Sequence, residues 1–356
     1  MFKITRDAII IWFRNRFPVD TLARHLKTKQ VPQHRHSIWY YFGGLTLFFF
    51  IVQFVTGILL MFYYRPTPDH AYESILFIMH EVRFGWVIRS IHSWAANLMI
   101  ATLFIHLISV FYMQAYRPPR ELMWISGVIL LGLVLGFGFT GYLLPWDEMA
   151  FYATQIGTEI PRSIPVIGES IMILLRGGRE IGSATLTRMY ALHVVVLPLI
   201  TLFLVGLHLF LNQYYGVSRP VKVKKKKEPI KFFPNFMLRD IRAWLGAMLV
   251  LLSIAMLSPW GLGEEADLLK PAPEGIKPEW YFLPLYQTLK IVPSRIWYFD
   301  GEALVNIIFL LGGLLLVALP FIDRKSRNDE NNMFIKIIGT IVLIYLIILT
   351  IIAYID

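Results

Sequence analysis

The chain has 356 residues, of which 56% are hydrophobic, and its mean hydropathy is +0.57. This composition is too apolar for a water-soluble protein of this length, and the apolar residues occur in runs of about 20, enough to span a bilayer as a helix. The absence of cysteine excludes disulfides, thiolate metal sites and iron–sulfur clusters within the chain.

The N-terminal segment 1–38 is polar, basic and broken by Pro18 and Pro32, so we expect no cleavable signal peptide there. Its residues 9–17 are typical of a helix that lies on the membrane surface. The rest predicts an all-α fold, a polytopic transmembrane bundle of seven spanning helices. We expect these spans near 39–63, 86–113, 122–144, 189–214, 242–258, 303–321 and 333–354.

The distribution of charge predicts the orientation. Of the 34 Lys and Arg residues, 23 fall on the side of the N-terminus, which gives that side a net charge of +15 and the other side −5. Because cytoplasmic loops carry the Lys/Arg excess, we expect a cell (inner) membrane protein with a cytoplasmic N-terminus and an outer C-terminus. The net charge of +10 thus reflects topology and contact with anionic lipid, not nucleic-acid binding.

Two loops on the predicted outer side are long, 145–188 and 259–302, and the second contains Pro278-Glu279-Trp280-Tyr281. Loops of this length in a compact protein are usually functional. The sequence therefore divides into a basic N-terminal segment, a four-helix core, a basic cytoplasmic linker and a three-helix part with the outer loop. Their bounds are 1–38, 39–215, 216–241 and 242–356.

Two of the predicted spans each carry a pair of histidines. His92 and His106 lie fourteen residues apart, and His193 and His208 lie fifteen apart. At about 1.5 Å rise per residue, both separations are roughly 21 to 22 Å along a helix axis. A single histidine in a membrane often only bonds a neighbouring helix, but two matched pairs favour axial ligands of two stacked haems, each held by both helices.

Glycines repeat with the same spacing in the first and third spans, at Gly43 and Gly57 and at Gly127 and Gly141. Small residues are common wherever membrane helices pack closely. The match to the histidine spacing instead indicates clearance for two flat macrocycles. Arg89, one helical turn before His92, is either a cationic helix end or the partner of a haem propionate.

These features together resemble cytochrome b of the quinol–cytochrome c oxidoreductase (cytochrome bc) complexes, over nearly the whole chain. The motifs that carry the resemblance are the two histidine pairs, residues 141–146 (GYLLPW) and residues 278–281 (PEWY). The fifteen-residue histidine spacing, the seven spans and residues 62–67 (FYYRPT) are similar to the chloroplast-type branch, in which the protein is split in two. Here the two halves are fused.

The resemblance implies roles for these residues. His92 and His193 would ligate a low-potential b haem near the outer face, and His106 and His208 a high-potential one nearer the cytoplasm. Quinol, either menaquinol or ubiquinol, would be oxidised between the loop after Pro145 and the 278–281 segment. Glu279 would accept a proton or hydrogen-bond the quinol, with Tyr281 as a second group. Without the resemblance, Glu279 reads equally well as an exposed loop acid.

The resemblance also implies a proton-motive Q cycle. One electron would pass to a Rieske iron–sulfur protein that serves a cytochrome c-type subunit, and one through the two haems to a quinone near the cytoplasmic face. The complex would be a homodimer. Asp240 resembles the proton-donating aspartate of the mitochondrial-type quinone site, although a helix-start acid is common without that role. Tyr41 occupies the place of a cysteine that attaches an extra haem in the chloroplast-type branch, so we expect no covalent haem.

Two other functions compete with this one. A di-haem membrane anchor of a quinone-linked dehydrogenase or reductase would need the histidines but not an outer quinol site. A haem-free transporter would use the histidines as a proton relay. Glu279 and its loop favour the quinol-oxidising subunit over the anchor.

Overall fold

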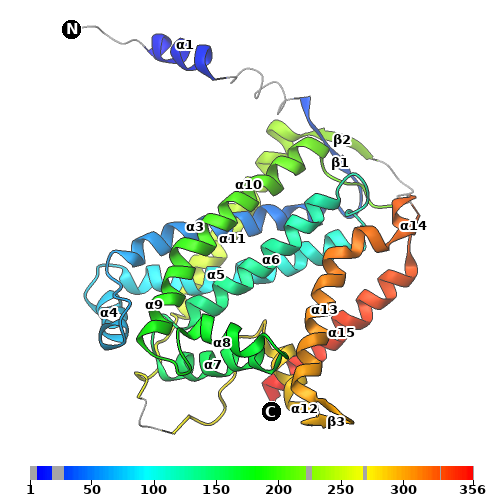
Figure 1. The fold of residues 1–356 in the computed structure, drawn as a ribbon. Coiled ribbons are helices and arrows are strands. Elements are labelled where there is room, and N and C mark those ends of the chain that lie inside the picture. The colour runs from blue at the N-terminus through cyan, green and yellow to red at the C-terminus, as the bar shows by residue number, and fades with distance from the viewer. Residues whose placement is uncertain (1–5, 18–27, 222–226, 268–270, 329, 356) are drawn as a thin grey trace, which may run out of the picture.

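The computed structural model describes residues 6–17, 28–221, 227–267, 271–328 and 330–355. Within these ranges, seven helices are long and apolar enough to cross a membrane, which confirms the predicted all-α transmembrane bundle (Figure 1). The candidate spans are Ser37–Met61, Gly85–Tyr112, Glu121–Tyr142, Ser183–Tyr215, Phe232–Leu257, Gly301–Arg327 and Met333–Ile355.

The helices within the spans end where the sequence supplies a cap or a turn. Asp300 accepts a hydrogen bond from the Ala303 backbone N–H at 2.8 Å and so begins one of them. Gly216, with φ +69°, ends another in a conformation that favours glycine. The helices are α3 (Tyr41–Met61), α5 (Gly85–Tyr112), α6 (Glu121–Tyr142), α9 (Ser183–Ala191) continued by α10 (Leu197–Tyr215), α11 (Met237–Leu257), α13 (Gly301–Ile322) and α15 (Met333–Ile355).

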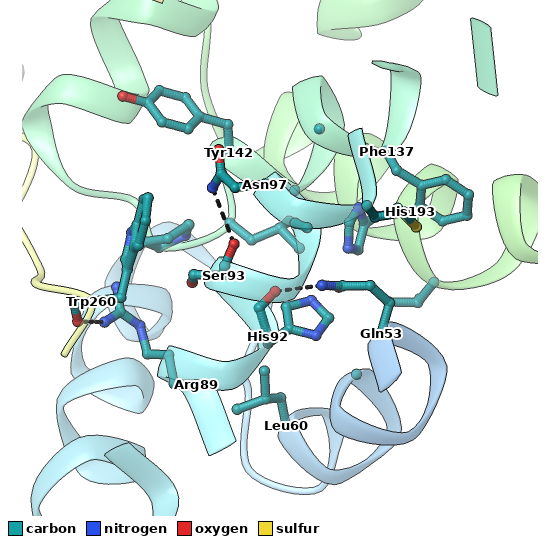
Figure 2. Close-up of a pocket in the computed structure, with 18 of the residues that line it drawn as sticks. Gln53, Leu60, Arg89, His92, Ser93, Asn97, Phe137, Tyr142, His193 and Trp260 are labelled. Atoms are coloured by element: carbon teal, nitrogen blue, oxygen red, sulfur yellow. Dashed lines mark hydrogen bonds between the residues drawn. The ribbon is translucent and has the colours of Figure 1, made fainter. Parts of the chain in front are cut away.

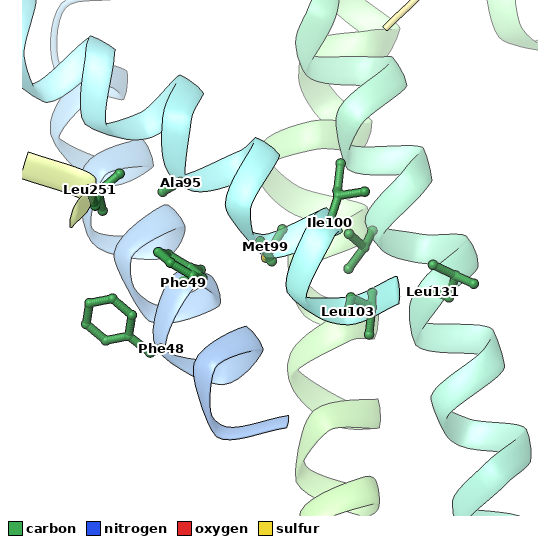
Figure 3. Packing of buried hydrophobic residues seen from close by; sticks show 9 residues of the cluster. Phe48, Phe49, Ala95, Met99, Ile100, Leu103, Leu131 and Leu251 are labelled. Atoms are coloured by element: carbon green, nitrogen blue, oxygen red, sulfur yellow. The ribbon is translucent and has the colours of Figure 1, made fainter. Parts of the chain in front are cut away.

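Helix α3 packs along α5, and α6 packs along α10, while α11 covers α3 and α5 and α13 lies against α6. Apolar side chains pack together where these helices meet (Figure 3). Because lipid tails are as apolar as these side chains, close packing rather than burial from water stabilises the contact. The cluster consists of Phe48, Phe49, Ala95, Met99, Ile100, Leu103, Leu131, Val134 and Leu251.

A wide turn interrupts the fourth span. Residues Leu192–Val196 form a π-helical turn between α9 and α10, and Pro198, which lacks an N–H to donate, follows it. A π turn absorbs one extra residue without breaking the helix. The fifteen-residue step from His193 to His208 therefore spans nearly the same rotation as the fourteen-residue step from His92 to His106.

Short helices gather at one end of the bundle, which we call the loop end. Asp147 caps the first of them by accepting from the Ala150 backbone N–H at 2.9 Å. The elements here are α4 (Pro68–His80), α7 (Glu148–Glu159), the 3₁₀ turn Ile160–Ser163, α8 (Gly168–Arg176), α12 (Leu283–Ile291), β3 (Arg295–Ile296) and β4 (Phe299–Asp300).

The opposite end, which we call the strand end, holds a small sheet that the sequence did not predict. Strand β1 (Gln30–Gln33) pairs antiparallel with β2 (Lys227–Lys231), with Gln30 opposite Lys231 and Val31 opposite Ile230. The basic linker is therefore tied to the N-terminal segment by backbone hydrogen bonds. The remaining elements are α1 (Arg6–Arg16), which covers most of the helix predicted at 9–17, the 3₁₀ turn Ser37–Tyr40, the π turn Phe232–Phe236 and α14 (Arg324–Arg327).

The orientation stays a prediction, and the lack of cysteine allows a clean test. We expect an impermeant maleimide added to intact cells to label an exposed Glu274→Cys at the loop end and to spare an exposed Glu228→Cys in β2. Permeabilised cells should show labelling at both positions. Labelling of Glu228→Cys alone in intact cells would mean that the membrane orientation is reversed.

Candidate functional site

The two histidines nearest the loop end face each other across the bundle. The ring centroids of His92 on α5 and His193 in the π turn are 6.4 Å apart, with the rings inclined at 70° (Figure 2). Imidazole nitrogens bind metal ions at about 2 Å, so two such bonds plus two ring radii span roughly 6 Å. The separation therefore fits one metal ion bound by both rings.

Hydroxyl groups hold three of the four histidines in the same way. Thr56 Oγ1 lies 2.8 Å from His92 Nδ1, Thr140 Oγ1 lies 3.2 Å from His193 Nδ1, and Ser126 Oγ lies 3.0 Å from His208 Nδ1. Each hydroxyl also donates to a carbonyl of its own helix, at 2.7, 2.8 and 3.0 Å respectively.

Because the hydroxyl proton is committed to that carbonyl, the oxygen can only accept from the histidine. Nδ1 must then carry the ring proton, which leaves the Nε2 lone pair free. A neutral imidazole with a free Nε2 is the form that binds a metal ion. The three supported histidines are thus prepared as ligands, and the donor set fits the axial ligation of haem iron.

The four glycines predicted from the spacing each lie against one histidine ring. A Cβ atom added to any of them would meet the Cε1 atom of that ring at 2.6 to 3.4 Å. The missing side chain at each glycine therefore makes room for an imidazole ring. The glycine spacing in the sequence had instead suggested this space for the haem macrocycle. The pairs are Gly43 with His106, Gly57 with His92, Gly127 with His208 and Gly141 with His193.

Arg89 is 6% exposed and lies next to His92, but its guanidinium is already engaged. It donates to the carbonyls of Trp260 at 2.6 Å and Gly261 at 2.8 Å, which belong to the segment after α11. Arg89 therefore fastens that segment over the loop end of the bundle. A guanidinium has five N–H donors, so Arg89 can also bind an anionic group in the adjoining cavity.

A cavity of about 290 Å³ joins this histidine pair to the predicted quinol site. Glu279 and Tyr281 line it together with His92, His193 and Arg89. Burial raises the pKa of the Glu279 carboxyl, which favours its protonated form. Burial also raises the pKa of the Tyr281 phenol, and Glu279 and then Tyr142 raise it further, so Tyr281 stays a donor at neutral pH.

The segment that carries Glu279 is anchored by its neighbour. The Trp280 indole donates to Asn97 Oδ1 at 2.8 Å, and the Asn97 amide donates to the Ser93 carbonyl at 3.1 Å, one residue after His92. The Phe282 N–H donates to the Glu279 carbonyl at 2.8 Å and closes the turn into α12. Glu279 is thus positioned by the same helix that carries His92.

Sequence reasoning missed several of these residues. The Tyr281 ring packs where a Cβ on Gly138 would stand, with Cζ 2.8 Å from that point. Gly138 lies one helical turn before Gly141, a spacing that the sequence displays. Asn97 gave no such signal, because its partner is distant in sequence. The hydroxyl residues were visible: Thr56, Ser126 and Thr140 each directly precede one of the histidine-facing glycines.

Asp240 lies apart from this cavity, in the first turn of α11, where its carboxylate packs against Gly44. Gly44 follows Gly43, so Asp240 and the His106 ring lie against consecutive residues of α3. Asp240 Oδ1 and Trp244 Nε1, one turn apart on α11, are both buried and have no hydrogen-bond partner among the residues described. Tyr41 stacks on Phe236 with ring centroids 5.2 Å apart.

A model of the family described as cytochrome b/b6/petB matches residues 26–216, more than half of the chain. The chain belongs to the cytochrome b family. A model of cytochrome b(C-terminal)/b6/petD matches residues 265–355, so the two parts that the sequence suggested are joined in one chain. Members of this family typically bind b haems.

Individual relatives agree with this family. The chain is 49% identical over 349 residues to the cytochrome bc complex cytochrome b subunit of Chlorobaculum thiosulfatiphilum, covering 97% of this chain and 80% of the relative. It is 46% identical over 210 residues to cytochrome b6 of Acaryochloris marina (strain MBIC 11017), covering 59% of this chain and 97% of the relative. A structure of a hyperthermophilic respiratory Complex III is similar, with a TM-score of 0.83 and 30% identity over 97% of this chain and 91% of that one.

Replacing a single histidine tests the ligand assignment. We expect His92→Leu, His106→Leu, His193→Leu or His208→Leu to lose one of two b haems, because each metal ion would keep only one imidazole. The pyridine haemochrome assay, normalised to protein, measures the count. His70→Leu, an exposed histidine of α4, is the control that should retain both haems. A full complement of haem in His92→Leu would contradict the assignment.

Proposed function

We propose that this chain is the cytochrome b subunit of a quinol:cytochrome c, or similar acceptor, oxidoreductase complex. The observation that carries the proposal is the single cavity shared by His92, His193, Glu279 and Tyr281. A carboxyl group and a facing pair of imidazoles line it together, which supports a site that takes protons and electrons from a quinol. The named relative from a cytochrome bc complex and the similar Complex III structure support the same assignment.

In this proposal two non-covalent b haems are held by His92 with His193 and by His106 with His208. When bound, they supply one-electron transfer between the two ends of the bundle. The chain provides the neutral imidazoles and the glycine clearances. Arg89 lines the cavity beside His92, and in this proposal it would pair with an anionic haem substituent.

Glu279 acts in this proposal as the proton acceptor for quinol. Its carboxyl is half-buried in the cavity, and burial raises its pKa toward the range in which it can accept and then release a proton. Tyr281, which remains protonated, donates a hydrogen bond to the quinol oxygen. The Trp280–Asn97 bond holds the turn so that the carboxylate stays in the cavity that the histidine pair also lines.

A second quinone site is proposed near the strand end, where quinone would be reduced. Asp240 Oδ1 is an acceptor and Trp244 Nε1 a donor, and both are buried and unpartnered in the described structure. A quinone carbonyl accepts a hydrogen bond and a quinol hydroxyl donates one, so this pair suits both forms of the substrate. Its place beside the Gly43–His106 contact would put the quinone close to the second histidine pair.

The partners follow from what the chain lacks. Without cysteine it cannot hold an iron–sulfur centre. We therefore propose a Rieske iron–sulfur protein and a cytochrome c-type subunit as electron acceptors, in a homodimeric complex within the cell membrane. Residues 39–215 would form the di-haem part, 216–241 the linker and 242–356 the part that completes the quinol site.

Quinol oxidation by the purified complex tests this function. We expect added quinol to reduce both b haems and, in the same preparation, a cytochrome c acceptor, because one electron goes each way. The optical spectra of the b haems and of the acceptor measure both events. Haem reduction without any acceptor reduction would instead support the alternative function, a di-haem anchor of a dehydrogenase.

Glu279→Gln tests the proton acceptor, since the amide keeps the shape and removes the base. We expect quinol oxidation about a hundredfold slower, the low end of a general-base contribution, with both haems retained. In the unaltered complex the rate should fall as pH drops through the raised pKa of Glu279, because the protonated carboxyl accepts no proton. The variant should lack this limb of the pH profile.

Steady-state acceptor reduction across pH, on complexes of verified haem content, measures both effects. Glu274→Gln, which changes an exposed acid of the same loop, serves as the control and should retain the original profile. An unchanged rate and pH profile in Glu279→Gln would remove this residue from the mechanism.

A further inference from the structure

Three of the four histidine-facing glycines are preceded by a hydroxyl residue, and the fourth is not. Thr56-Gly57, Ser126-Gly127 and Thr140-Gly141 each place the hydroxyl on Nδ1 of the histidine that the glycine faces. The fourth dipeptide is Phe42-Gly43. Helix α3 carries both kinds, fourteen residues apart: a hydroxyl residue precedes the glycine that faces His92, and a phenylalanine precedes the glycine that faces His106.

The consequence is visible at His106. Its Nδ1 is buried and has no hydrogen-bond partner among the residues described. His106 is therefore the one ligand of the four without hydrogen-bond support behind its ring in this part of the structure.

A hydrogen bond at Nδ1 changes how strongly a histidine donates charge to a metal ion through Nε2. A histidine whose Nδ1–H donates to an acceptor becomes a more basic ligand through Nε2, and its ring orientation is fixed. A more basic ligand stabilises the oxidised, more positive state of the metal. An unsupported imidazole donates less charge, so the reduced state is relatively favoured and the reduction potential is higher.

We propose that the residue before each histidine-facing glycine sets the reduction potential of the haem that this histidine would bind. Phe42 would raise the reduction potential of the haem at the strand end, because it offers no hydrogen bond to His106. This proposal rests on the haem binding proposed above. It makes Phe42, Thr56, Ser126 and Thr140 positioning residues that act through the histidines. The loop-end pair has two hydroxyl supports and the strand-end pair has one, so the potential rises in the direction from the quinol cavity to Asp240.

Phe42→Thr compared with Phe42→Val is the decisive experiment. Both substitutions remove the phenyl ring, which stacks on Trp39 with centroids 5.5 Å apart, and the two new side chains have nearly the same shape. Only threonine can accept from His106 Nδ1. In optical redox titrations of the purified complex, we expect the potential of the strand-end haem to be lower in Phe42→Thr than in Phe42→Val.

The difference should correspond to a roughly two- to tenfold change in the ratio of reduced to oxidised haem at a fixed ambient potential, the effect of one ordinary hydrogen bond. The loop-end haem should not shift. Equal potentials in the two variants would overturn the proposal. Fewer than two b haems in the unaltered protein would instead show that the proposed function itself has failed.

Thr56→Val gives the reverse test if the Phe42 variants do not fold. It removes the hydroxyl behind His92 and keeps the side-chain shape, so the loop-end haem should titrate at a higher potential while the strand-end haem stays unchanged. Thr46→Val, which removes a hydroxyl of α3 that bonds Thr102 and the Phe42 carbonyl, is the matched control and should shift neither haem. An unshifted loop-end potential in Thr56→Val would overturn the proposal independently.

Discussion

The tautomer of the buried histidines is the constraint on which the rest of the site depends. In the bilayer an imidazole has no water to satisfy it, so each ring nitrogen needs a partner in the protein or a ligand. A hydroxyl whose own proton is committed to a helix carbonyl can only accept, and this fixes the proton on Nδ1. Nε2 then points across the bundle with a free lone pair. The glycine next to each hydroxyl lets the ring approach the neighbouring helix, so the dipeptide sets both distance and protonation.

The cavity that Glu279 and Tyr281 line is built outward from this histidine layer. Helix α5 carries His92, then Asn97 one to two turns later, and Asn97 accepts the hydrogen bond that holds Trp280. The turn that contains Glu279 is therefore fixed relative to His92 even though 187 positions separate them in the sequence. Arg89, on the same helix, fastens the segment after α11 by two carbonyls. One helix thus positions His92, the turn that contains Glu279 and the cover of the cavity.

The sequence predicted those features whose cause is local or periodic. The seven spans follow from uninterrupted apolar runs, and the histidine and glycine pairs follow from equal spacing along helices. Contacts that join distant segments could not be predicted in the same way. The pairing of Val31 with Ile230, the Trp280–Asn97 bond and the carbonyl partners of Arg89 depend on how the chain folds back on itself. The π turn could be predicted only in part. Pro198 indicates that the helix is irregular there, but the sequence does not show that the turn contains an extra residue.

Two helix pairs, α3 with α5 and α6 with the fourth span, use nearly the same device twice, with glycines fourteen residues apart facing histidines on the partner helix. A fully repeated arrangement would give both ends of the bundle the same ligand strength and no preferred direction for an electron. Direction requires a difference between the two layers, and in our proposal the hydrogen bonding behind the ligands supplies it without altering any ligand. One such difference lies at residue 42, where a phenylalanine stands in place of a hydroxyl residue. An asymmetry in the hydrogen bonding behind the ligands can therefore order two otherwise similar sites along the membrane normal.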